Sequence, residues 1–79
     1  MKVNVYVTLK KGVLDPQGKA IKGSLQKLGY SEIKDVRPGK FIEVELDETS
    51  TDKAKERIEE MSKRLLANTV IEDFKYEIK

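Results

Sequence analysis

An unbroken alternation of apolar and polar residues near the start of the chain restricts its fold more than any other feature. From residue 2 to residue 10 every second side chain is apolar, and these side chains are Val3, Val5, Val7 and Leu9. Successive side chains of a β-strand point to opposite faces, so this period of two predicts a strand with one buried face and one solvated face.

The segment after this strand carries the signals of a helix start. Asp15 can accept a hydrogen bond from a free N–H of the first turn, and Pro16 suits the first helical position. Leu14 is placed to fold back on the first turn as a hydrophobic staple. The signals of a helix start do not account for the presence of Gln17 and Gly18. A glycine in the first turn is unfavourable, because Gly in a helix costs roughly 0.5–1 kcal/mol of stability relative to Ala. We therefore expect another group to approach Gly18 closely.

The first helix continues with a narrow apolar stripe at spacings i, i+4 and i+7, formed by Ile21, Leu25 and Leu28. Gly29 is expected to end it in the left-handed conformation. Two strands follow at residues 32–37 and 40–46, and Pro38-Gly39 is expected to form the hairpin turn between them.

The second half of the chain predicts one more helix and one more strand. Ser50 or Thr51 can cap the helix, whose inward stripe is expected to be Ala54, Ile58, Met61 and Leu65. Asn68 suits a left-handed position at the helix end. The last strand then carries Val70, Phe74, Tyr76 and Ile78 on one face. Leu66 and Ile71 fall outside both inward stripes, which suggests that they contact another chain.

This order of elements predicts an α+β fold, a βαββαβ ferredoxin-like two-layer sandwich with two helices on one face of an antiparallel sheet. We expect a single domain over residues 1–79. A chain of 79 residues has a thin core, so association with a second copy is the expected source of further burial.

Composition excludes several classes of function. The chain has neither His nor Cys, which removes the commonest acid–base catalyst, a thiolate nucleophile and most metal ligands. Its net charge of +2 is too small for a nucleic-acid-binding field, and there is no phosphate-binding glycine motif. No apolar run is long enough for a membrane span, and the start of the chain lacks a signal-peptide pattern. We expect a cytoplasmic, non-catalytic protein that binds no nucleic acid and no membrane.

Several ordered blocks of the chain resemble the PurS family. These blocks are residues 5–10, 14–20, 28–30, 35–40 and 65–74, and together they extend over nearly the whole sequence. PurS is the small subunit of phosphoribosylformylglycinamidine (FGAM) synthase in purine biosynthesis. One departure is visible at Met61-Ser62, where many members have Met-Cys, and no catalytic role depends on that Cys.

The resemblance implies a non-catalytic subunit of a glutamine-dependent C–N ligase. It implies a PurS-like homodimer, with a tetramer left open, that joins a glutaminase subunit to a synthetase subunit and supports ammonia transfer between them. ATP and Mg would act in the synthetase partner, and this chain would hold no cofactor. A second hypothesis is a dimeric small-molecule-binding regulatory domain of the same topology, with an effector held near Gly18.

Candidate contact residues lie in three places, and each has a simpler structural interpretation that stays open. At the helix start, Asp15, Pro16, Gln17 and Gly18 form a cap or also contact a partner. Arg37 and Lys40 are solvated charges or bind a carboxylate, a phosphate or a partner's backbone. After the second helix, Asn68 in the simpler interpretation is only the residue that ends the helix. Leu66, Val70 and Ile71 beside it are better candidates for contact between subunits.

Overall fold

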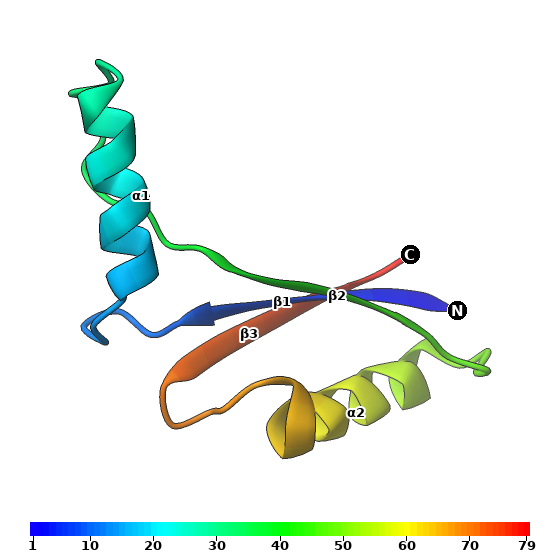
Figure 1. Cartoon of the computed structure of the whole chain (residues 1–79). Coiled ribbons are helices and arrows are strands. Elements are labelled where there is room, and N and C mark those ends of the chain that lie inside the picture. Colours follow the sequence, from blue (N-terminus) through cyan, green and yellow to red (C-terminus); the bar gives the residue numbers. More distant parts are fainter.

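The computed structural model describes all 79 residues, and its centre is a three-stranded antiparallel sheet of order β2-β1-β3 (Figure 1). The strands are β1 (Lys2–Leu9), β2 (Gly39–Glu45) and β3 (Glu72–Ile78). Helix α1 (Pro16–Lys27) connects β1 to β2, and helix α2 (Thr51–Met61), extended by a π-helical turn η1 (Ser62–Leu66), connects β2 to β3. The alternation of residues 2–10 therefore predicted the central strand.

The core lies between one face of the sheet and α2. Val3, Val5 and Val7 of β1 are fully buried or nearly so, and Ile58 of α2 packs against them. The Tyr76 hydroxyl on β3 donates a 2.8 Å hydrogen bond to Glu59 Oε1 on α2. This face of β1 is therefore covered by α2, as the hydrophobic pattern of both elements predicted.

Helix α1 stands apart from this core and projects beyond the end of the sheet (Figure 1). Gly18 is the one buried residue of α1, and Leu28 just after the helix is 74% exposed. The radius of gyration is 15.8 Å, whereas a compact domain of this length has a value of about 12 Å. In the single chain, α2 alone covers the sheet, and the apolar stripe of α1 is left without a sheet to cover.

The strand predicted at residues 32–37 does not form, and the hairpin predicted at Pro38-Gly39 was wrong. Residues 33–38 belong to no strand, and β2 begins directly at Gly39, which lies opposite Thr8 of β1. The physical reason is a contact that is distant in sequence, because the Val36 carbonyl lies against the first turn of α1 at Gly18. The segment follows the helix there and has no strand as a neighbour.

The π-helical turn changes which side chains face the sheet. Ala67 N–H donates to the Ser62 carbonyl, an i to i+5 bond that places one extra residue in the turn. Leu65, predicted in the inward stripe, is 85% exposed, whereas Leu66 packs against the core. The prediction that Leu65 faces inward and the prediction that Leu66 has no place in the core were both wrong, because they extended the α-helical period past Met61.

The helix ends agree in most respects with the local signals. Asp15 Oδ1 accepts the Gly18 N–H at 3.0 Å, and Ser50 caps α2 by accepting the Lys53 N–H. Gly29 has φ +103° and ends α1 as predicted. Asn68 does not adopt the left-handed conformation, since every residue with positive φ is a glycine. Leu14 is 67% exposed and does not form a staple.

Candidate functional site

The predicted close approach at Gly18 comes from this chain itself. A Cβ at residue 18 would overlap the Val36 carbonyl oxygen, so the first turn of α1 accepts only glycine without a shift of the backbone. Gly18 is buried by this contact. The contact holds the segment before β2 against α1 and shapes the surface around the helix start.

A hollow of about 650 Å³ lies at this end of the molecule, and we call it the basic groove. It is bordered by the end of β1, by the loop that leads to α1, by the first two turns of α1 and by the segment before β2. Its charged side chains are Lys10, Lys11, Asp15, Lys19, Lys22, Asp35 and Arg37. A smaller hollow beside it is lined by Gln17, Lys40 and Glu72, among others.

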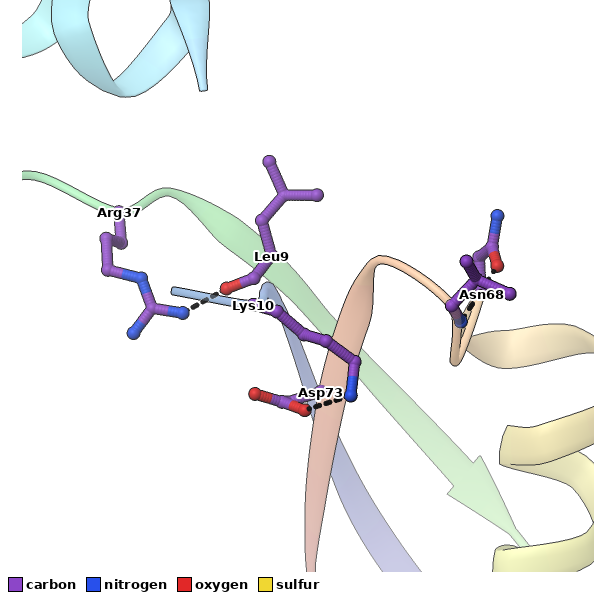
Figure 2. A network of polar contacts seen from close by, with 6 residues as sticks. Leu9, Lys10, Arg37, Asn68 and Asp73 are labelled. Carbon is purple, nitrogen blue, oxygen red and sulfur yellow. Dashed lines mark hydrogen bonds and ion pairs between the residues drawn. The ribbon is translucent and has the colours of Figure 1, made fainter. Parts of the chain in front are cut away.

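Two of the basic side chains are engaged within the chain (Figure 2). Lys10 Nζ lies 3.2 Å from Asp73 Oδ1 on β3, and Arg37 donates a hydrogen bond to the Leu9 carbonyl. Lys11, Lys19 and Lys22 form no ion pair. The groove therefore has three lysines that form no ion pair with a carboxylate of the chain.

The predicted contact residues Asp15, Gln17, Gly18, Arg37 and Lys40 come together around these two hollows. Pro16 is exposed beside them at the first position of α1. The same set includes three lysines that were not predicted from the sequence, Lys11, Lys19 and Lys22. The spacing of Lys19 and Lys22, three residues apart on one helix, was the available signal.

The turn between η1 and β3, residues 67–71, carries three of the four remaining predicted residues, and the fourth, Leu66, lies in η1 and packs against the core. Asn68 organises it, because its Oδ1 accepts the Val70 N–H and its own N–H donates to Glu72 Oε1. Val70 is 81% exposed and Ile71 is 40% exposed. Ile71 also accepts a 2.8 Å backbone hydrogen bond from Lys10, which joins this turn to the start of the basic groove.

The sheet face opposite α2, which we call the open sheet face, carries an aromatic pair with a lysine beside it. Tyr6 and Phe41 stack with ring centroids 5.3 Å apart, and Lys75 Nζ lies 5.5 Å from the centre of the Tyr6 ring. Next to them along β1, Asn4 is buried, yet its Oδ1 has no hydrogen-bond partner. A buried amide oxygen without a partner is costly.

Two ionisable side chains, Glu48 and Tyr76, have shifted pKa values. Hydrogen bonds from the Ser50 and Thr49 N–H groups lower the pKa of Glu48, and the bond to Glu59 raises the pKa of Tyr76. Both groups take part in structural contacts of α2, away from the two hollows. The structure contains no cluster of three or more His, Cys, Asp or Glu side chains suited to a metal. No helix combines the length and the apolar character that crossing a membrane requires.

The strand connections and the antiparallel sheet define the class as a small ferredoxin-like α+β domain. The family model PurS, phosphoribosylformylglycinamidine (FGAM) synthase, matches residues 2–79. The chain is 48% identical to FGAM synthase subunit PurS of Bacillus subtilis over 77 residues, 98% of this chain and 90% of that protein. It is 46% identical to the PurS subunit of Methanocaldococcus jannaschii over 78 residues, 99% and 92% of the two chains. The chain therefore belongs to the PurS family.

Solved structures agree with this assignment and confirm the predicted fold class. A crystal structure of B. subtilis PurS matches with a TM-score of 0.85 and 49% identity over 99% of this chain and 96% of that chain. The structure of PurLQS from Thermotoga maritima contains a chain that matches with a TM-score of 0.87 and 29% identity, over 96% and 93% of the two chains. The chain is thus an accessory subunit of FGAM synthase, a ligase complex of purine biosynthesis.

Proposed function

We propose that this chain joins the glutaminase and synthetase subunits of FGAM synthase and supports the passage of ammonia between them. The observation that carries the proposal is the concentration of the predicted contact residues at one end of a chain that has no His and no Cys. A structure of the T. maritima PurLQS assembly contains a chain of the same fold, which supports a role in association. ATP and Mg act, in this proposal, in the synthetase partner.

The proposal includes a homodimer, which can pair further into a tetramer. Only nine of the 79 residues are buried, and the dimensions of 48 × 25 × 14 Å are those of an extended molecule. The exposed apolar side chains are Leu14, Leu28, Tyr30, Phe41, Leu65, Val70 and Ile71. A second copy that covers the open sheet face and the stripe of α1 would remove Phe41 and Leu28 from water and give Asn4 Oδ1 a partner.

Reconstitution tests the proposed function. The glutaminase and synthetase subunits from the same organism are assayed for FGAM formation with glutamine or with ammonia as nitrogen donor, with and without this chain. We expect glutamine-dependent activity to appear when the chain is added, and ammonia-dependent activity to change much less. Equal glutamine-dependent rates with and without the chain would contradict the proposal. Light scattering on the purified chain measures the dimer separately.

A further inference from the structure

The positive charge of the molecule is concentrated in the basic groove. Five basic and two acidic side chains line it, a surplus of three positive charges, whereas the whole chain has a net charge of +2. The rest of the molecule therefore has a slight negative surplus. A concave surface of one sign attracts groups of the opposite sign and raises their local concentration.

The two acidic residues of the groove are already committed to the backbone. Asp15 Oδ1 accepts the Gly18 N–H, and Asp35 Oδ1 accepts the Val36 N–H at 2.9 Å. Because Asp15 already accepts the Gly18 N–H in the first turn of α1, the free N–H groups of the helix start are not what would attract an anionic group to the groove. The free cationic groups are Lys11, Lys19 and Lys22, which come from the loop before α1 and from α1 itself.

The other lining residues favour a protein segment over a small ligand. Pockets for small molecules are mostly apolar, with aromatic side chains that stack on the ligand. Four of the thirteen lining residues are hydrophobic, and none of them is aromatic. Leu14, at 67% exposure, stands among the lysines as an apolar contact. A central apolar side chain with a charged rim is the usual anatomy of a protein–protein interface.

We propose that the basic groove binds an acidic segment of another subunit of FGAM synthase, with its carboxylates on Lys11, Lys19 and Lys22 and an apolar side chain on Leu14. This inference rests on the proposed role of the chain in joining subunits. Arg37 and Lys10 hold the wall of the groove through their contacts with the Leu9 carbonyl and Asp73.

A hexaglutamate peptide with a fluorescent label tests the groove without the other subunits. The variant Lys11→Gln/Lys19→Gln/Lys22→Gln is compared with Lys53→Gln/Lys55→Gln/Lys63→Gln, which removes the same charge from exposed positions of α2 and η1. We expect the groove variant to bind the peptide at least tenfold more weakly and the control variant to bind within twofold of wild type. Raising the salt concentration should weaken wild-type binding. Equal weakening by both triples, or displacement of the peptide by inorganic phosphate or ADP at equal concentration, would overturn the proposal.

The same variants are then tested in the assembled enzyme. We expect the groove triple to weaken association with the other subunits at least tenfold while light scattering shows an unchanged homodimer. If wild type and the groove triple assemble equally well, the groove proposal is overturned and the proposed function stands. If the groove triple loses self-association instead, the occupant is a second copy and the proposal is also overturned. If the wild-type chain does not assemble with the other subunits at all, the proposed function fails, and the partner named for the groove is wrong. The hexaglutamate experiment then still decides whether the groove binds acidic peptides.

Discussion

The hydroxyl of Tyr76 donates a 2.8 Å hydrogen bond to the carboxylate of Glu59 and so ties the edge strand β3 to helix α2. The hydrogen bond, with a smaller effect of desolvation, raises the pKa of Tyr76 above its ordinary value. A raised pKa means that folding favours the protonated phenol. Its contribution to stability is therefore complete below the unfolded pKa of about 10 and is lost as the pH rises through the higher folded pKa.

We expect Tyr76→Phe to lower the free energy of unfolding by about 0.5 kcal/mol at neutral pH, at the low end for a hydrogen bond because the pair is solvent-exposed. The difference from wild type should decrease above pH 10 and disappear once the pH exceeds the raised pKa of the folded state, where the phenol is ionised in both states. Urea unfolding at a series of pH values measures this dependence. A difference that stays constant up to pH 11 would show that the hydroxyl contributes nothing that titrates.

Two glycines of α1 should respond to alanine in opposite directions. Gly18→Ala places a Cβ against the Val36 carbonyl and should destabilise the chain by about 1–3 kcal/mol, the cost of overpacking. Gly23→Ala meets no atom within 4 Å and should stabilise the helix by about 0.5–1 kcal/mol. Thermal melts of both variants test the contact, and a neutral Gly18→Ala would show that the segment before β2 does not pack on α1.

Neighbouring leucines of η1 should differ in their effect on stability. Leu66 packs against the core, so Leu66→Ala should cost about 1–3 kcal/mol, less than the value for a fully buried leucine. Leu65 is 85% exposed, and Leu65→Ala should change the free energy of unfolding by less than about 0.5 kcal/mol. Chemical denaturation compares the two. The reverse order of costs would mean that the α-helical period continues past Met61.

The exposed turn before β3 should matter for assembly and not for the fold. Ile71→Asp or Val70→Asp introduces a charge into an apolar surface and, if a partner covers it, should weaken association by more than tenfold. Thr69→Asp is the matched control, since it adds the same charge in the same turn. Size-exclusion chromatography with light scattering, and co-elution with the other subunits, measure both. Unchanged elution of the Ile71 and Val70 variants would remove this turn from the interface.

Leu66→Asp is not a suitable test of a subunit interface. The sequence pattern placed Leu66 with Ile71 as an apolar residue without a place in the core, whereas the π-helical turn rotates Leu66 toward the sheet. A charge there would disturb the packing of the single chain, so a loss of association could not be assigned to an interface.

Much of the fold could be predicted from the sequence because it depends on neighbours along the chain. Strand β1 follows from alternation, α1 begins at an Asp-Pro pair, and Gly29 ends it with positive φ. The family resemblance was also visible in the sequence, since its blocks are short and ordered. The candidate contact residues were recognised mainly through that resemblance, and the three unpaired lysines of the groove were not recognised at all.

Local sequence signals were enough for three of the four predicted strands, for both helices, for their order and for the family, because alternation, capping and residue types act over a few residues. The tertiary structure decided three further points: the path of residues 33–38, the side chains that face the core after Met61, and the gathering of lysines around the start of α1. Each depends on contacts between residues far apart in the chain or on a change of helical period. The Val36 carbonyl at Gly18 illustrates the reason, because packing against a distant helix prevailed over a weak local preference for a strand.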